Sequence, residues 1–258
     1  MTTATTVSAP TPPDADSAWR ALHEQASAPY RRSGRFAWHF ARGKLRHDPV
    51  FRGLLERGDL GARAPTLRVV DIGCGQGLLA SLLQACNDAR AAGRWPSAWP
   101  AQARAAHYTG IELMPKDVAR ADAAVGRLPL APHFICGDMC RTALPDCDLV
   151  VILDVLHYVD HAAQLGVLQK VRQALAPQGR LLLRVGDAAN QRGFAISQWV
   201  DHVVTLARGH RVPPTWGRTL QAWTSLLQGL GFVVRSIPQS QGTPFANVLL
   251  VADLPGSA

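Results

Sequence analysis

The sequence has little lysine, no long block of basic residues and no long apolar segment. Its only lysines are Lys44, Lys116 and Lys170, so the formal net charge of +8 comes almost entirely from arginine. No five basic residues stand together, and a nucleic-acid-binding tail is therefore not indicated. The longest apolar run, residues 149–153, is far shorter than the roughly 20 residues that cross a bilayer. We expect no membrane span, and we do not expect nucleic acid as the partner.

Paired cysteine motifs are also missing. The five cysteines are odd in number and form no Cys-x-x-Cys pair; they are Cys74, Cys86, Cys136, Cys140 and Cys147. This pattern predicts reduced thiols and no structural zinc. The first sixteen residues carry neither a basic residue nor an apolar block, so no secretory signal is expected there. We interpret residues 1–16 as a disordered tail and predict a cytoplasmic protein.

What is present is the composition of one α/β domain, predicted over residues 17–258. The chain has 258 residues and 47% hydrophobic content, enough to bury a sizeable core. Its central feature is an apolar, β-branched run over residues 67–72, followed by Gly73, Gly75 and Gly77 and then by leucines at helical spacing. This order indicates a strand, a tight turn and a helix. Glycines without Cβ atoms and unpaired N–H groups at a helix start favour docking of a polar or anionic ligand end.

The spacing of acids around this turn distinguishes between two kinds of ligand. A dinucleotide-binding turn reads Gly-x-Gly-x-x-Gly and has an acid about 20 residues later. Here the turn reads Asp-x-Gly-x-Gly-x-Gly from Asp71, and the next well-placed acid, Glu112, comes much later. A nicotinamide cofactor is therefore disfavoured.

The turn resembles the first motif of the class I S-adenosylmethionine (SAM) methyltransferases, and further motifs follow in the family's order. Glu112 ends a predicted strand over residues 107–112, and Asp138 follows a third strand over 132–136. The apolar run over 148–159 resembles the fourth motif. The resemblance implies a Rossmann-like α/β fold with a seven-stranded, mostly parallel sheet whose last strand is antiparallel. Three further strands are predicted over residues 180–185, 232–237 and 245–251.

The resemblance also implies roles for the strand-end residues. Asp71 and the glycine turn would hold the amino acid part of SAM. Glu112 would accept from both ribose hydroxyls, which suits a carboxylate because it offers two acceptor oxygens. Asp138 would take the adenine amine, and Met139 would pack on the ring. The full set of cofactor-binding residues is Asp71, Gly73, Cys74, Gly75, Gln76, Gly77, Glu112, Leu113, Asp138, Met139 and Leu153.

SAM brings its own electrophile, so a strong base in the protein is optional. A phenolic acceptor, with a pKa of about 10, would benefit from a neighbouring histidine, whereas a carboxylate acceptor would need none. His157, just after the fourth strand, is the candidate base; the alternative is a histidine that only packs locally. His157 and His161 lie near Asp154 and Asp160, but their order matches no metal motif, and no metal site is predicted.

Two helical regions are expected to border the acceptor. Residues 17–60 are predicted as an N-terminal helical lid, beginning with a helix over residues 17–25 capped by Ser17. Within the lid, Phe36, Trp38, His39 and Phe40 fall at helical spacing among arginines. Either this aromatic stripe packs on the sheet, or the arginines face a carboxylate or phosphate. Residues 186–230 are predicted as a helical substrate-side segment. The substrate-side candidates are Arg31, His161, Trp199 and His202.

A closer resemblance covers nearly the whole chain apart from the tail. Residues 30–44, 152–158, 183–188 and 242–251 resemble those of methyltransferases from bacterial aryl polyene (xanthomonadin-like) pigment clusters. This similarity implies a small aromatic acceptor carried on an acyl carrier protein, with the basic N-terminal segment facing an acidic partner. We favour O-methylation of this acceptor, although oxygen, nitrogen and carbon all stay open as the acceptor atom. Two alternatives stay open: an RNA methyltransferase, supported by the charge but lacking an Asn-Pro-Pro-Tyr type motif, and a SAM-binding protein without catalysis.

Overall fold

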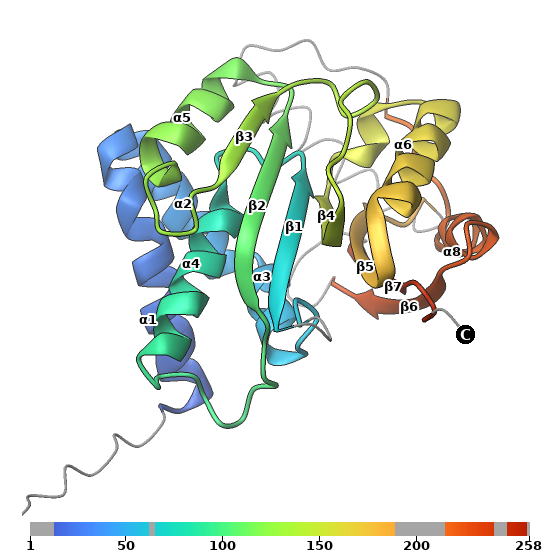
Figure 1. Cartoon of the computed structure of the whole chain (residues 1–258). Helices are drawn as coiled ribbons and strands as arrows, with labels where there is room; N and C mark the ends of the chain where they lie inside the picture. Colours follow the sequence, from blue (N-terminus) through green and yellow to red (C-terminus); the bar gives the residue numbers. More distant parts are fainter. Residues whose placement is uncertain (1–12, 62–64, 189–214, 240–246, 257–258) are drawn as a thin grey trace, which may run out of the picture.

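The computed structural model describes residues 13–61, 65–188, 215–239 and 247–256 (Figure 1). Trp199, His202 and most of the substrate-side segment lie outside these residues. The elements before the glycine turn are α1 (Ala15–Ser27), the 3₁₀ helix η1 (Ala28–Ser33), α2 (Arg35–His47), α3 (Pro49–Glu56) and β1 (Thr66–Ile72). Then follow α4 (Leu78–Ala91), β2 (Arg104–Glu112), α5 (Pro115–Val125), β3 (His133–Cys136) and β4 (Cys147–Leu153). The remaining elements are η2 (Leu156–Tyr158), α6 (His161–Ala174), β5 (Leu175–Gly186), α8 (Leu220–Gly229), β6 (Val233–Pro238) and β7 (Asn247–Asp253).

The strands form one seven-stranded sheet in the order β3-β2-β1-β4-β5-β7-β6. Neighbouring strands are parallel from β3 to β5, and β7 is antiparallel to both β5 and β6. This arrangement confirms the fold predicted from the sequence. The strand order reverses between β1 and β4, and open α/β sheets bind ligands at the carboxyl edge of such a reversal.

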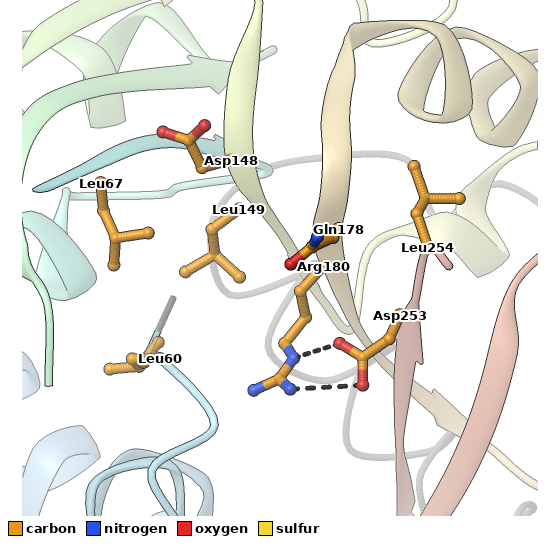
Figure 2. A pocket seen from close by; sticks show the side chains of 9 residues that line it. Leu60, Leu67, Asp148, Leu149, Gln178, Arg180, Asp253 and Leu254 are labelled. Atoms are coloured by element: carbon orange, nitrogen blue, oxygen red, sulfur yellow. Dashed lines mark hydrogen bonds and ion pairs between the residues drawn. The ribbon is translucent and has the colours of Figure 1, made fainter. Parts of the chain in front are cut away.

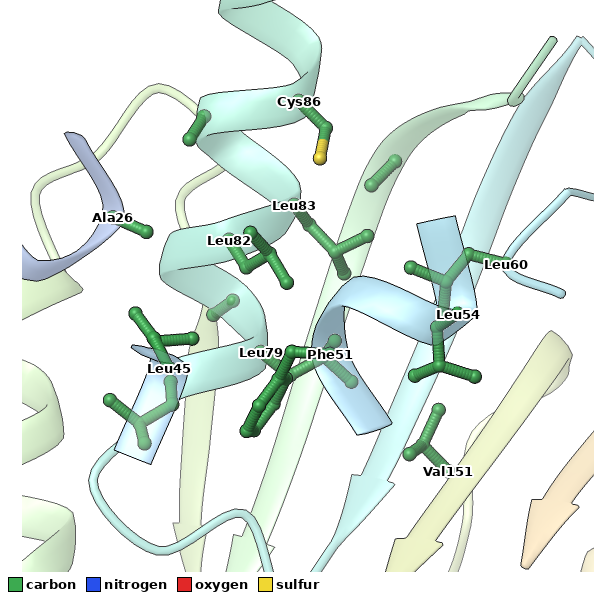
Figure 3. Packing of buried hydrophobic residues seen from close by; sticks show 14 of the residues in the cluster. Ala26, Leu45, Phe51, Leu54, Leu60, Leu79, Leu82, Leu83, Cys86 and Val151 are labelled. Atoms are coloured by element: carbon green, nitrogen blue, oxygen red, sulfur yellow. The ribbon is translucent and has the colours of Figure 1, made fainter. Parts of the chain in front are cut away.

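Both faces of the sheet are buried, which explains the continuous apolar runs in the central strands. Alternate residues point to opposite faces, so Val69 belongs to the cluster under the N-terminal helices and α4, whereas Val70 belongs to the cluster under α6 and α8. Figure 1 shows these two helical layers on either side of the sheet. In Figure 3, Phe51 and Leu54 of α3 lie among leucines of α4 and Val151 of β4. The N-terminal segment is thus part of the main core.

The first helix starts earlier than the sequence predicted. Asp14, not Ser17, is its N-cap: the Asp14 carboxylate accepts hydrogen bonds from the backbone N–H groups of Asp16 and Ser17, at 3.0 and 2.9 Å. Aspartate is among the strongest N-cap residues, because its side-chain oxygen satisfies N–H groups of the first turn. Residues 15 and 16, which we had placed in the disordered tail, therefore belong to α1.

Only part of the aromatic stripe of α2 packs as the first interpretation required: Trp38 and Phe40 are partly buried and pack against the main core, whereas Phe36 does not. The buried side of α2 consists of Ala37, Ala41 and Leu45. Phe36 is 61% exposed, and Phe40 stacks on it with ring centroids 6.3 Å apart. Small residues allow α2 to approach its neighbours closely, and this places the larger rings at the rim.

Some predicted boundaries shift by a few residues. Helix α4 ends at Ala91, and β2 starts at Arg104 rather than at the predicted residue 107, so a Trp- and Pro-rich loop joins them. Within it Trp99 is buried and meets Trp95 edge to face. The apolar run after Asp148 leaves the sheet at Leu153 and ends in η2. Within the described part of the chain, no helix combines the length and apolarity that a membrane crossing needs.

Candidate functional site

The glycine turn after β1 has the backbone geometry that its sequence predicted. Gly73, Gly75 and Gly77 all have positive φ values, of +75°, +54° and +74°. The backbone N–H groups of Gly73 and Cys74 both donate to the carbonyl of Ile111 in β2, at 2.7 and 3.2 Å. This pair of bonds fastens the start of the turn to the neighbouring strand, and α4 begins directly after Gly77 without a side-chain cap.

The three glycines serve two different purposes. A Cβ on Gly73 would lie 2.4 Å from Val155, and one on Gly77 would lie 2.8 Å from Phe134. A Cβ on Gly75 would meet no atom within 4 Å. The outer two glycines are therefore required by packing within the protein, whereas Gly75 faces open space beside the turn.

Glu112, at the end of β2, faces this same turn. Its Oε2 accepts from the backbone N–H of Gly75 at 3.0 Å, and its Oε1 accepts from that of Met114 at 2.9 Å. A carboxylate offers about four acceptor positions, so each oxygen keeps capacity for a further donor such as a hydroxyl group. The next residue, Leu113, leaves 63% of its surface exposed. Open space at Gly75, a carboxylate with spare acceptor capacity and an exposed apolar side chain together fit a nucleoside cofactor.

Asp71 lies under the turn and is almost fully buried. The hydroxyl of Tyr108 donates to its Oδ2 at 2.6 Å. Burial raises the pKa of Asp71 to about 7, the hydrogen bond from Tyr108 acts in the opposite direction, and the charge of Glu112 adds to the increase. Asp71 is therefore held by Tyr108 of β2 at the start of the turn and carries a proton through much of the acidic pH range.

This buried acid predicts an unusual dependence of stability on pH. Because the folded pKa is raised above the ordinary value of 3.8, folding stability is full at low pH and is lost as pH rises towards about 7. Asp71→Asn keeps an acceptor for Tyr108 and cannot ionise. We therefore expect the stability of Asp71→Asn relative to the wild type to increase between about pH 5 and about pH 8. The increase in the difference in unfolding free energy should be ~3 kcal/mol, and it should appear as a rising difference in melting temperature.

Thermal unfolding at several pH values, without cofactor, measures this difference. Asp138→Asn is the matched control, since the Asp138 side chain is 42% exposed and the substitution is chemically the same. A difference that stays constant with pH, or that Asp138→Asn reproduces, would show that Asp71 is not the group responsible.

Asp138 follows β3 on the same edge of the sheet. The backbone N–H of Gly137 donates to the carbonyl of Glu112 at 3.0 Å, so the two strand ends are adjacent. The Asp138 side chain accepts from the backbone N–H of Cys140 at 2.8 Å. From α6, the ammonium group of Lys170 donates to the carbonyls of Met139 and Thr142, at 2.6 and 3.0 Å. This loop is thus fixed from two sides.

The turn after β4 brings His157 to the site. Val155, two residues before it, occupies the space beside Gly73, so this turn contacts the glycine turn directly. His157 is partly buried; this burial lowers its pKa, and the charge of Asp154 partly opposes this. The carbonyl of His157 accepts from the backbone N–H of Trp216 at 2.8 Å. His157 is therefore held as a predominantly neutral imidazole at neutral pH.

Two of the substrate-side candidates are described, and they lie apart from each other. The ring of His161 meets Trp216 edge to face at 5.5 Å, and its Nε2 lies 3.3 Å from the carbonyl of Gly217. The guanidinium group of Arg31 lies 5.2 Å from the ring centre of Trp38, on the N-terminal segment. No group of three or more potential metal-binding side chains occurs among the residues described.

Tyr30 is a contact that the sequence did not reveal. Its ring is fully buried, and its hydroxyl donates to the carbonyl of Gln76, within the glycine turn, at 2.8 Å. The side-chain amide of Gln76 in turn donates to Asp117 of α5 at 3.2 Å. The N-terminal segment therefore supports the turn directly. A single buried tyrosine far from the motif gives no signal in the sequence.

A small pocket lies at the opposite, amino edge of the sheet and is separate from this site. Figure 2 shows Leu67 and Asp148, near the starts of β1 and β4, together with Arg180 and its ion pair to Asp253. The glycine turn, Glu112, Asp138 and His157 all follow the carboxyl ends of their strands. We therefore place the candidate site at the carboxyl edge.

The fold and this edge define an α/β enzyme that binds a nucleoside cofactor after β1 and β2. The chain belongs to the methyltransferase domain family, whose model matches residues 18–237. It is a SAM-dependent methyltransferase of class I, and S-adenosylmethionine is its cofactor.

Solved structures share the fold at low sequence identity. Magnesium protoporphyrin IX methyltransferase from Synechocystis PCC 6803, with bound SAH, aligns over 94% of this chain and 100% of its own, at 18% identity and a TM-score of 0.55. An O-methyltransferase family protein from Burkholderia thailandensis aligns over 88% of this chain and 63% of its own, at 18% identity and a TM-score of 0.57. Mitomycin 7-O-methyltransferase aligns over 95% of this chain and 74% of its own, at 23% identity and a TM-score of 0.53. No curated protein matches the sequence.

Proposed function

We propose that this methyltransferase transfers the methyl group of SAM to an oxygen atom of a small aromatic acceptor. The observation that carries the proposal is the contact between the two turns: Val155, in the turn that holds His157, fills the space beside Gly73. A histidine with a lowered pKa next to the cofactor turn suits deprotonation of a phenol. Two of the structural neighbours carry an O-methyltransferase title, which agrees with this acceptor atom.

The cofactor supplies a methyl group on a sulfonium centre, and the protein supplies position and a dry environment. Glu112 would hold the ribose hydroxyls while keeping its bonds to the backbone of Gly75 and Met114. Leu113 and Met139 would border the adenine ring, and Asp138 would accept from its amine. Asp71, which is bonded to Tyr108, would support the turn from its buried position at the end of β1. His157 takes the proton of the acceptor hydroxyl.

The acceptor is proposed to be attached to an acyl carrier protein in aryl polyene pigment biosynthesis in the cytoplasm. Support comes from the basic N-terminal segment, where Arg31 and Arg32 are exposed and the guanidinium groups of Arg31 and Arg42 lie 5.2 and 5.6 Å from the ring centre of Trp38. An exposed cationic surface suits an acidic carrier protein. The net charge of +8 has the same sign.

Mass spectrometry after incubation with SAM tests the acceptor class. The panel contains free and carrier-bound hydroxybenzoates, their vinylogous acids, and total RNA. A mass gain of one methyl group on an aromatic acceptor, with release of S-adenosylhomocysteine, would support the proposal, and fragmentation would identify the methylated atom. Methylation of RNA alone, or of no aromatic compound while SAM binds, would overturn it.

Substitution of His157 tests its role as base. With a phenolic acceptor, His157→Gln is expected to lower kcat by about 100-fold, in the usual range for general-base catalysis. Because the pKa of His157 is lowered from 6.5, wild-type activity should be constant near neutral pH and fall only below that value as the imidazole becomes protonated. This decrease in activity at acidic pH should be absent in His157→Gln.

Initial rates across the pH range provide both readouts, and titration calorimetry should show unchanged SAM affinity. The control is His133→Gln, at an exposed position at the start of β3. Equal rates of wild type and His157→Gln on a phenol would mean that His157 only packs in the turn.

A further inference from the structure

The most buried arginine described in the structure lies at the carboxyl edge of the sheet, in an ion network that the site above does not use. Arg184 of β5 is 3% exposed. Its Nη1 and Nη2 donate to the two carboxylate oxygens of Asp48 at 2.5 and 2.8 Å. Its Nε donates to Asp154 at 2.8 Å, and Nη2 contacts the second oxygen of Asp154. One guanidinium group therefore binds two carboxylates in a forked geometry.

The network is balanced in charge, and its central pair, Arg184 and Asp48, is almost fully buried. Lys44 lies 2.7 Å from Asp48, so two cations face two carboxylates. Burial alone would raise the pKa of Asp48, but the hydrogen bonds and charges of Arg184 and Lys44 more than offset it, and the pKa lies well below its usual range. Asp48 is therefore a carboxylate at any working pH. A buried arrangement of this kind is sensitive to the loss of any member, because the remaining charge is left uncompensated.

The two carboxylates of the network belong to different segments of the chain. Asp48 is the junction between α2 and α3 and also caps α3. Asp154 follows β4 with a left-handed φ of +60°, and its backbone N–H donates to the carbonyl of Arg184 at 3.3 Å. The next residue, Val155, is the one that touches Gly73. A displacement at Asp154 would therefore move both the cofactor turn and the turn with His157.

We propose that Arg184 is a positioning residue, which holds the N-terminal segment and the turn after β4 in register with the cofactor turn. It reaches the acceptor side through Asp154 and the N-terminal segment through Asp48. This role deepens the proposed function and rests on it for the catalytic readout. The hydrogen-exchange readout below does not depend on it.

Asp154→Asn tests the positioning role with the smallest change to the network. Asparagine tolerates the left-handed conformation, and Arg184 keeps its two bonds to Asp48, so the variant is expected to fold. With an active acceptor, kcat should fall by about 10-fold to 100-fold, because small displacements from the reactive geometry are costly. The KM for SAM should change by less than about threefold, since Glu112 and Gly75 are untouched.

Arg184→Lys and Arg184→Met test the arginine itself. Lysine can satisfy one carboxylate as a point charge but not two in a fork. We therefore expect kcat to decrease from wild type to lysine to methionine. Hydrogen exchange should accelerate at least tenfold in residues 35–47 and 154–158, and not in the core strands β1 and β4. Where Arg184→Met does not fold, the double variant with Asp48→Asn removes one uncompensated charge.

Arg180→Met is the matched control. Arg180 lies on the same strand and forms a forked pair with Asp253, but at the amino edge of the sheet. Arg180→Met should have a lower melting temperature than the wild type, but the amide hydrogen exchange of residues 35–47 and 154–158 should be unchanged. If Arg180→Met and Arg184→Met act alike on exchange and on kcat, Arg184 only stabilises the fold and the proposal is overturned.

The same experiments separate this proposal from the function on which it rests. If no aromatic acceptor is methylated, the proposed function fails, while the hydrogen-exchange pattern of the Arg184 variants still decides the positioning role. Selective loss of protection would support the role without turnover. Unchanged protection in Arg184→Met and in Asp154→Asn would overturn it.

Discussion

Glu112→Gln is expected to weaken SAM binding by about 100-fold or more. The carboxylate would accept two ribose hydroxyls as charge-assisted hydrogen bonds, and each such bond contributes about 1.5–3 kcal/mol. Glutamine presents one oxygen and one NH₂ group, so it cannot accept from both hydroxyls while serving the backbone N–H groups of Gly75 and Met114. Titration calorimetry with SAM and with S-adenosylhomocysteine measures the loss, which should be similar for both ligands.

A matched substitution controls for the change in charge. Asp122→Asn removes one negative charge from an exposed position on the neighbouring helix α5. Its affinity should match the wild type within about twofold. Circular dichroism must show that Glu112→Gln is folded, with a stability loss of about 1 kcal/mol from the backbone bond that it gives up. Unchanged affinity in Glu112→Gln would refute the assignment of the ribose site.

Gly73→Ala and Gly75→Ala are expected to fail in different ways, although they are two residues apart. A Cβ on Gly73 would lie 2.4 Å from Val155, and Gly73 has a left-handed φ of +75°, which alanine adopts only with strain. Overpacking of about 1–3 kcal/mol adds to a backbone cost of about 1–2 kcal/mol, so a large fall in melting temperature is expected. Displacement of Val155 also moves the turn with His157, and turnover should be lost with it.

Gly75→Ala meets no protein atom, so it should cost only the backbone term of about 1 kcal/mol. Its methyl group would instead stand in the space where the cofactor approaches the turn, and SAM affinity should fall by at least about tenfold, in a protein that remains folded. Thermal unfolding and titration calorimetry on both variants measure the two effects. A destabilised Gly75→Ala with wild-type affinity would contradict this placement of the cofactor.

The order of the strand-end acids could be predicted because each follows a recognisable apolar strand. Asp71, Glu112 and Asp138 lie at or just after the ends of β1, β2 and β3, and parallel strands bring their carboxyl ends to one edge. The three contacts nevertheless differ. Glu112 faces the turn, Asp138 closes a local loop, and Asp71 is buried beneath Tyr108. Periodicity gives the edge on which a residue lies and does not give the partner of its side chain.

The N-terminal segment shows where such reasoning fails. Spacing placed the aromatic residues of α2 on one stripe but left open whether that stripe packs inwards. The fully buried positions are Ala37, Ala41 and Leu45, and Trp38 and Phe40 are only partly buried against the same core. Small side chains let the helix approach its neighbours closely, and this close packing selects the buried face. Similarly, the tail boundary was misplaced because a capping aspartate, Asp14, competes with a nearby serine for the same role.

Strand runs, the glycine turn and the strand-end acids are local patterns, and they were enough to predict an α/β domain with a ligand-binding turn after its first strand. The seven-stranded sheet and the cofactor followed from the resemblance of these motifs to the class I methyltransferases. The residues that hold the site together could be found only in the folded chain. Arg184 and Asp48 are separated by 136 positions, and Tyr30 and Gln76 by 46. No local period links such pairs. Their contact depends on how α2, α3 and η1 pack across the sheet, and the energy of a buried ion pair or hydrogen bond exists only after that packing has excluded water.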